Sequence, residues 1–472
     1  MTQSLLTCGA RLTLKIAINS VARGAASWLA LIITSAVLMV VLTLSIGLIV
    51  AGASARGEIQ EAYVSMGGVA LGFTVLTGLI SFRLVVSTCV RLQRQDVALW
   101  QIAGVLPTAA LAIMIVEIFL VTIVSALLGG LTAMVLWPEY THFVDDSGLL
   151  HSDVLTGPLP LVAMVIGIAT TAGVSLLSGV RSAKKVVRED LVSASQSGIP
   201  PSTTVGAKIT TAIAAIVLVA GTVTLYLVIG HADRISDPEQ LNEVLTSYPG
   251  MGLLNCLLFA VVSRPLVRAL TAVLRGIPLG TPGFLATREA SARPALTRAL
   301  VVPITLAAAA VGVMSSWIHE LTWVMDTLAP ESGSVSAPPR QLFLLLGGPV
   351  VVVCVRAAAI IFATTSHRRR DNALLMVSGA ATRDVIVKVI VEAAVYTVAC
   401  LLCSYTIVIA NDVAMATALS AGPVGSVPVL VPGWSSAAVV VFGVVLTVTM
   451  LFIITAAGMR REPVSVILGA RS

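Results

Sequence analysis

Ten long apolar segments dominate this chain of 472 residues and set the first constraint on its fold. A membrane-spanning helix needs about 20 predominantly apolar residues. Lipid offers the backbone no hydrogen-bond partners, so runs of this length predict helices that satisfy their own N–H and C=O groups. We therefore predict an all-α integral membrane protein with ten transmembrane helices, at residues 28–51, 66–90, 108–135, 159–180, 208–230, 250–275, 299–318, 342–365, 385–410 and 433–458.

The distribution of basic residues predicts the orientation of these helices. With the N-terminus inside, most lysines and arginines fall in inner segments, and only Arg56, Arg234 and Arg340 fall in outer ones. This bias follows the positive-inside rule, so both termini are predicted to be cytoplasmic. The net charge of +6 is then explained by membrane topology, and no nucleic-acid partner is expected.

A sequence pattern occurs twice in the chain, 275 positions apart, at residues 94–122 and 369–397. Each copy combines a short charged helix with a following apolar segment that contains a glutamate. The matched residues are Arg94, Asp96, Ala98, Leu99, Gly104, Val116, Glu117 and Thr122 with Arg369, Asp371, Ala373, Leu374, Gly379, Val391, Glu392 and Thr397.

This repetition predicts the domain organisation. Equivalent spans are six apart, an even number, so the two repeats are expected to be parallel rather than inverted. We predict a first four-span repeat at 1–194, a linker with two central spans at 195–280, and a second four-span repeat at 281–472. Amphipathic surface helices are expected before the first span of each repeat, at 5–23 and 284–293.

The first connecting segment (91–107) and the second (367–383) join spans two and three of their repeats. We expect each to form a helix that ends at its glycine, Gly104 or Gly379, because glycine favours the turn that ends a helix. We predict that both segments dock a cytoplasmic partner, although duplicated inner loops that only obey the charge rule remain the alternative. The predicted apolar contacts are Leu99, Trp100, Leu374 and Leu375, and the residues predicted to set the register are Arg94, Asp96, Arg369 and Asp371.

Arg83, Glu117, Arg356 and Glu392 are predicted to lie inside spans, at similar depths in the inner half of the membrane. A charge within a membrane-spanning helix costs about 2.5–3.5 kcal/mol on insertion scales, so a partner or water is expected. Their matching predicted depths in the membrane favour pairing of Arg83 with Glu117, and of Arg356 with Glu392. The alternative is that the arginines reach toward the membrane surface and the glutamates are protonated.

No chemical motif indicates an enzyme. The phosphate-binding pattern GxxxxGK[ST] is absent from the sequence, and no metal-ligand spacing stands out among its histidines and cysteines. We therefore expect no catalytic residue, no metal site and no cofactor on this chain.

The repeated motifs ALWQIAG and ALLMVSG, each followed by a span containing Val-Glu, resemble the FtsX-like permease domain of the MacB and bacitracin-type ABC transporters. The resemblance implies a permease subunit in the bacterial cytoplasmic membrane, with two copies of a cytoplasmic ATPase that bind ATP and magnesium and drive the spans by mechanotransmission. Because the outer loops are short, the remaining surface faces lipid, which favours export of an apolar or amphipathic substrate. The alternatives are a non-transporting subunit that relays ATPase strokes to a sensor kinase or wall hydrolase, and an ion-coupled transporter using Glu117 and Glu392.

Overall fold

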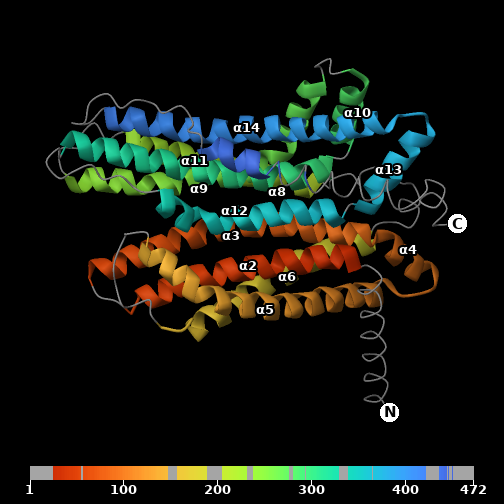
Figure 1. Cartoon of the computed structure of the whole chain (residues 1–472), viewed down its shortest axis with the longest axis horizontal. Coiled ribbons are helices and arrows are strands. Elements are labelled where there is room, and N and C mark those ends of the chain that lie inside the picture. The colour runs from red at the N-terminus through yellow and green to blue at the C-terminus, as the bar shows by residue number, and fades with distance from the viewer. Residues whose placement is uncertain are drawn as a thin grey trace, which may run out of the picture. The chain divides into compact units, whose positions relative to one another are not determined.

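The computed structural model contains only helices and turns among the residues it describes (Figure 1). The described residues are 25–54, 57–146, 157–188, 205–230, 238–275, 280–292, 294–328, 339–363, 365–420, 435–443, 445 and 449. The predicted surface helix at 5–23 lies outside this part of the chain. The all-α prediction is confirmed for the described residues.

Seven described helices are long and apolar enough to cross a membrane. Two further apolar helices, Tyr63–Gly78 and Ala212–Leu227, are shorter but coincide with predicted spans. Most of the predicted tenth span lies outside the described residues, so the count of ten stays a prediction. The seven spans are Trp28–Gly52, Pro107–Asp146, Leu161–Lys184, Tyr248–Leu270, Thr297–Val324, Phe343–Phe362 and Thr382–Thr417.

The chain divides into two compact units, of which unit 1 comprises residues 1–145, 151–202 and 358–368. In unit 1, α2 packs against α3 and α6, and α3 packs against α6. Glycines allow close approach: a Cβ on Gly67 of α3 would lie 2.5 Å from Ile49 of α2. Small residues are typical of such contacts between membrane helices. The helices of this unit are α2 (Ala25–Gly52), α3 (Glu58–Leu92), α4 (Arg94–Ile102), α5 (Pro107–Asp146) and α6 (Leu161–Arg188).

Unit 2 comprises residues 146–150, 203–357 and 369–472. Its central helix is α11, which packs against α9 and α14, and α10 packs against α14 and α9. The hydrophobic residues of α11 are almost all buried, so this helix forms the core of the unit. The helices of this unit are α8 (Val205–Gly230), α9 (Pro238–Arg275), α10 (Gly280–Ala292), α11 (Pro294–Leu328), α12 (Pro339–Ala363), α13 (Thr365–Val377) and α14 (Thr382–Ser420). The end of α12 and the start of α13, at residues 358–368, belong to unit 1.

Helices α5 and α14 are structural equivalents of each other. They begin at Pro107 and Thr382, which are 275 positions apart, the same offset as in the sequence repeat. Both bury the same face, as shown by the pairs Ala110 and Val385, Met114 and Val389, Glu117 and Glu392, Ser125 and Cys400, and Ala133 and Val408. The duplication therefore preserved the packing face of this helix as well as its sequence.

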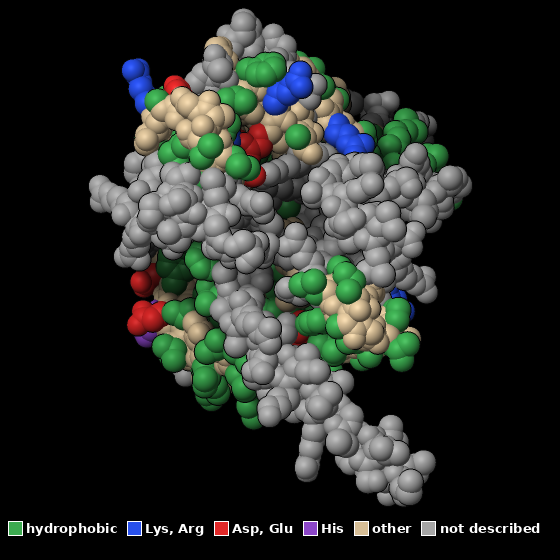
Figure 2. Space-filling model, turned by 90° about the vertical axis from the view of Figure 1, so that its right-hand side faces the viewer, with side chains coloured by type: hydrophobic (Ala, Val, Ile, Leu, Met, Phe, Trp, Pro, Cys, Tyr) green, Lys and Arg blue, Asp and Glu red, His purple; other side chains and the backbone are tan. Residues whose placement is uncertain are grey.

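Helix α5 also carries an exposed apolar face. Its outward residues include Phe119, Ile123, Leu127, Leu131 and Met134, which recur at helical spacing. Figure 2 shows such hydrophobic side chains, in green, on the exposed faces of the described helices. A helix with apolar residues on both its buried and its exposed side is typical of a membrane span.

Candidate functional site

Both connecting segments end in the same backbone structure. In the first, the N–H of Gly104 donates to the carbonyl of Gln101 at 3.0 Å, and the N–H of Val105 donates to that of Trp100 at 2.9 Å. This pair of bonds is the Schellman motif, which closes a helix at a left-handed glycine. Gly104 has a φ of 91°, in the region that favours glycine.

The second connecting segment repeats these bonds with equivalent residues. The N–H of Gly379 donates to the carbonyl of Met376 at 3.1 Å, and that of Ala380 donates to Leu375 at 3.0 Å. Gly379 has a φ of 98°. The predicted helix ends at Gly104 and Gly379 are therefore present in the structure, and each turn leads directly into α5 or α14.

Each connecting helix exposes a matched pair of apolar side chains. Leu99 and Ile102 are exposed on α4, and Leu374 and Val377 are exposed on α13. Residues three apart lie on the same face of a helix, so each pair forms one small patch. Leu99 and Leu374 were predicted from the sequence, whereas Ile102 and Val377 were not, although these two also align in the repeat.

The other predicted residues of the connecting segments take different positions. Trp100, Leu375 and Asp371 are half-buried. Trp100 and Leu375 therefore present less apolar surface than their exposed neighbours. The side chains of Arg83, Arg94, Asp96 and Arg369 lie outside the described part of the chain, so their predicted roles stay predictions.

The charges predicted to lie within spans are buried where the structure describes them. Glu117, Arg356 and Glu392 are each at most 1% exposed. The hydroxyl of Tyr396 donates a hydrogen bond of 2.6 Å to Oε1 of Glu392. Pairing of Arg356 with Glu392, and of Arg83 with Glu117, stays a prediction.

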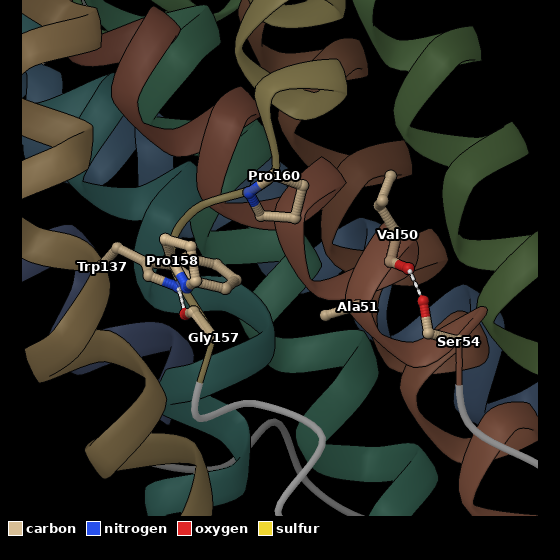
Figure 3. Close-up of a pocket in the computed structure, with 7 residues that line it drawn as sticks. All are labelled: Val50, Ala51, Ser54, Trp137, Gly157, Pro158 and Pro160. Atoms are coloured by element: carbon tan, nitrogen blue, oxygen red, sulfur yellow. Dashed lines mark hydrogen bonds between the residues drawn. The ribbon is translucent and has the colours of Figure 1, made fainter.

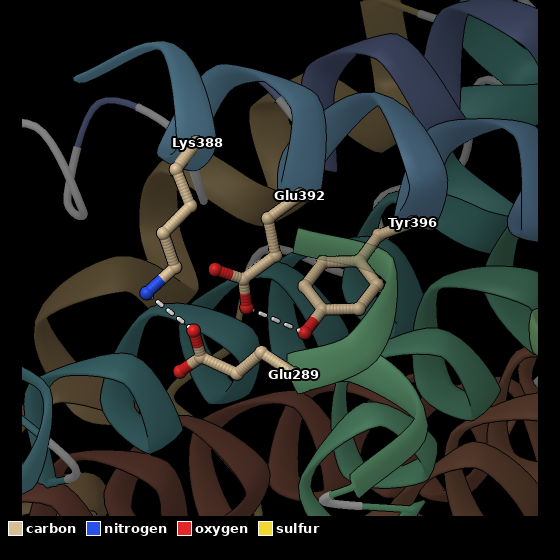
Figure 4. A network of polar contacts seen from close by, with 4 residues as sticks. All are labelled: Glu289, Lys388, Glu392 and Tyr396. Carbon is tan, nitrogen blue, oxygen red and sulfur yellow. Dashed lines mark hydrogen bonds and ion pairs between the residues drawn. The ribbon is translucent and has the colours of Figure 1, made fainter. Parts of the chain in front are cut away.

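A buried ion pair next to Glu392 was not predicted from the sequence. Lys388 of α14 forms a salt bridge with Glu289 of α10, and its side chain is only 5% exposed (Figure 4). In Figure 4, Lys388, Glu392 and Tyr396 all point from α14 toward α10. Lys388 could have been recognised as a charged residue one helical turn before Glu392 in an otherwise apolar segment. Its partner could not, because α10 is distant in sequence.

Helix α10 is in turn bonded to the start of α11. The hydroxyl of Thr297 in α11 donates a hydrogen bond of 2.8 Å to the carbonyl of Ala290 in α10. The first repeat has Ile113 at the position equivalent to Lys388, so this ion pair belongs to the second repeat alone. A continuous set of contacts therefore leads from α13 through α14 and α10 to α11.

A cavity of about 310 Å³ lies in unit 1, at the C-terminal end of α2 (Figure 3). Trp137 lines it, and its indole Nε1 donates a hydrogen bond of 3.0 Å to the carbonyl of Gly157. This volume is at the lower end of the range for small-molecule pockets. The lining residues are Val50, Ala51, Ser54, Trp137, Gly157, Pro158 and Pro160.

The long apolar helices define a multi-pass membrane protein. Residues 350–463 match the FtsX-like permease C-terminal family, and this match confirms the resemblance to that family predicted from the sequence. The matched segment contains α13 with its glycine turn, α14, and the buried residues Lys388 and Glu392. A search of curated proteins finds no match to the chain.

Proposed function

We propose that this chain is the membrane subunit of an ABC exporter, in which cytoplasmic ATPases drive extrusion of an apolar or amphipathic substrate. Proteins of the FtsX-like family generally work with a cytoplasmic ABC ATPase. ATP and magnesium bind to that partner in this proposal, and the present chain transmits movement. We place the protein in the bacterial cytoplasmic membrane, with both termini and both connecting segments on the ATPase side.

The observation that carries the proposal is the pair of matched exposed patches on α4 and α13. Each patch presents two aliphatic side chains on a helix that is closed by a Schellman turn and followed by a long apolar helix. A small apolar patch on a short helix suits insertion into a groove of a partner protein. Two such patches, at equivalent positions of a duplicated unit, favour two ATPase copies for each chain.

The contacts in unit 2 support transmission from the second patch. Movement of α13 is passed to α14 because the turn at Gly379 joins them directly. Lys388 and Glu289 connect α14 to α10, and Thr297 connects α10 to α11. Since α11 forms the core of the unit, three connections link the α13 patch to that core: the turn at Gly379, the Lys388–Glu289 ion pair and the Thr297 hydrogen bond.

Alanine substitutions in the two patches test the proposal. Burying a leucine side chain stabilises a complex by about 1.5–3 kcal/mol. Leu99 is 61% exposed, so about 1–2 kcal/mol is available on docking, or roughly a 5- to 30-fold change in affinity. We expect Leu99→Ala and Leu374→Ala each to weaken retention of the co-expressed ATPase on the purified permease, and the double variant to release it.

The controls are leucines of equal exposure on the lipid-facing sides of the following helices. Leu131 of α5 is 62% exposed, which matches Leu99, and Leu402 of α14 is 51% exposed, against 50% for Leu374. Alanine at either control position should leave ATPase retention unchanged. The proposal is wrong if no ATPase co-purifies, or if the patch variants retain it as well as the controls do.

Transport by the assembled complex in lipid vesicles separates an exporter from a regulator. An exporter moves an apolar or amphipathic fluorescent compound when ATP is supplied to the ATPase side. A subunit that only relays strokes to a kinase or wall hydrolase binds the same ATPase but moves no compound.

A further inference from the structure

A second buried polar cluster lies in unit 2, where the start of the α9 span meets the ends of α11 and α14. The hydroxyl of Tyr248 donates a hydrogen bond of 2.5 Å to Oδ1 of Asp412, and that of Ser316 donates one of 3.1 Å to Oδ2. These three residues are at most 4% exposed. Asp412 therefore has a hydroxyl donor on each carboxylate oxygen.

Glu320 belongs to the same cluster. It lies one turn beyond Ser316 on the same face of α11, and it is 1% exposed. Asp412 and Glu320 are close enough to interact electrostatically, and Tyr248 lies near both. Unlike Asp412, Glu320 has one carboxyl oxygen, Oε2, with no hydrogen-bond partner in the described structure.

No described lysine, arginine or histidine pairs with either carboxyl group. Among the described residues, the titratable groups that interact with them are Tyr248 from α9 and each other's carboxyls on α11 and α14, and Ser316 adds a neutral hydroxyl. An adjacent network of Tyr226, Asn255 and Asn411 adds only neutral groups. Two buried carboxylates without a basic partner are costly in their ionised form, and their negative charges also repel each other. One bound proton removes one of these charges together with the repulsion.

We infer that Glu320 and Asp412 form a proton-binding site, in which Glu320 holds one proton and Asp412 remains ionised. Asp412 is the ionised member because hydrogen bonds from Tyr248 and Ser316 stabilise its negative charge. Glu320 holds the proton because Oε2 lacks such a donor. The residues of the site come from three helices, α9, α11 and α14, that pack against one another. This inference goes beyond the proposed export function and does not depend on an ATPase.

Infrared spectroscopy of the full chain in lipid nanodiscs tests the site. At neutral pH we expect a C=O band of a protonated carboxyl group, and we expect Glu320→Gln to lose it. Glu392→Gln is the matched control, since it changes another buried glutamate of the same unit, and it should retain the band. A second variant, Tyr248→Phe, removes a donor from Asp412 and should shift the frequency of the same band, whereas Tyr405→Phe should not.

The inference is overturned if the protonated-carboxyl region of the spectrum is the same in Glu320→Gln and in the unmodified protein. If Glu320→Gln does not fold, an unshifted band in Tyr248→Phe overturns it equally. Neither measurement involves transport, so failure of the exporter proposal leaves this result interpretable.

Discussion

Alanine in place of Gly104 or Gly379 should weaken the end of its connecting helix by about 1–2 kcal/mol. The φ angles of 91° and 98° lie in the left-handed region, where an L-residue pays about 1–2 kcal/mol. A Cβ added at either glycine meets no atom within 4 Å, so no steric clash adds to this cost. The whole effect therefore comes from the backbone conformation that the turn requires.

Hydrogen–deuterium exchange measured by mass spectrometry detects this change. The amides of Gly104 and Val105, and of Gly379 and Ala380, are held by the bonds of the two turns. A loss of 1–2 kcal/mol corresponds to roughly 5- to 30-fold faster exchange through local opening. We expect this acceleration in peptides that cover the substituted turn, and unchanged exchange at the turn of the other repeat.

Gly68→Ala provides the matched control. Gly68 lies within α3, also with no atom within 4 Å of an added Cβ, but without a positive φ. Alanine there is neutral or stabilises the helix by up to about 1 kcal/mol. The explanation of the turns is refuted if Gly104→Ala and Gly379→Ala exchange no faster than Gly68→Ala at the corresponding amides.

Three further predictions concern the ion pair, the core of unit 2 and the topology. Lys388→Met removes the positive charge of the ion pair with Glu289 and should lower stability by about 1–3 kcal/mol in thermal unfolding, because the Glu289 side chain is 18% exposed and keeps part of its solvation. The double variant with Glu289→Gln should recover part of this loss, and equal stability of the single and double variants would contradict coupling. Gly312→Ala places a Cβ against Ser436 and 2.5 Å from Val408, so it should lower the stability of the protein by about 1–3 kcal/mol. The control Gly221→Ala, whose added Cβ has no neighbour within 4 Å, should not lower it. Similar unfolding temperatures for the two variants would show that the packing around Gly312 relaxes. Single cysteines introduced at 139–153 should react with a membrane-impermeant reagent added outside intact cells, and their protection would reverse the assigned orientation.

The sequence alone determined the membrane class and the positions of most spans. Apolar runs of about 20 residues have one stable solution in lipid, since a helix satisfies its own backbone groups. The sequence also determined both glycine turns, because a glycine at the end of a short helix has a specific conformational use. The repeated pattern, whose two copies lie 275 positions apart, carries this information twice, so Gly104 and Gly379 were predicted together.

Only the tertiary structure decided which polar groups meet. Glu289 pairs with Lys388 across 99 positions, and Tyr248 bonds to Asp412 across 164. Hydropathy measures how apolar each segment is, but it does not show which face of a helix packs against which neighbouring helix. Asp412 lies two residues beyond the predicted span at 385–410, and only the packing of α9 and α11 against α14 buries it.

The apolar patches show the same division within a single helix. The sequence predicted that the connecting segments carry apolar residues but could not distinguish exposed from half-buried ones. Leu99 and Ile102 are exposed while Trp100 is half-buried, because the rotation of α4 is fixed by its packing and by the turn at Gly104. The candidate docking surface is thus a property of the fold, built from residues whose apolar character the sequence had already supplied.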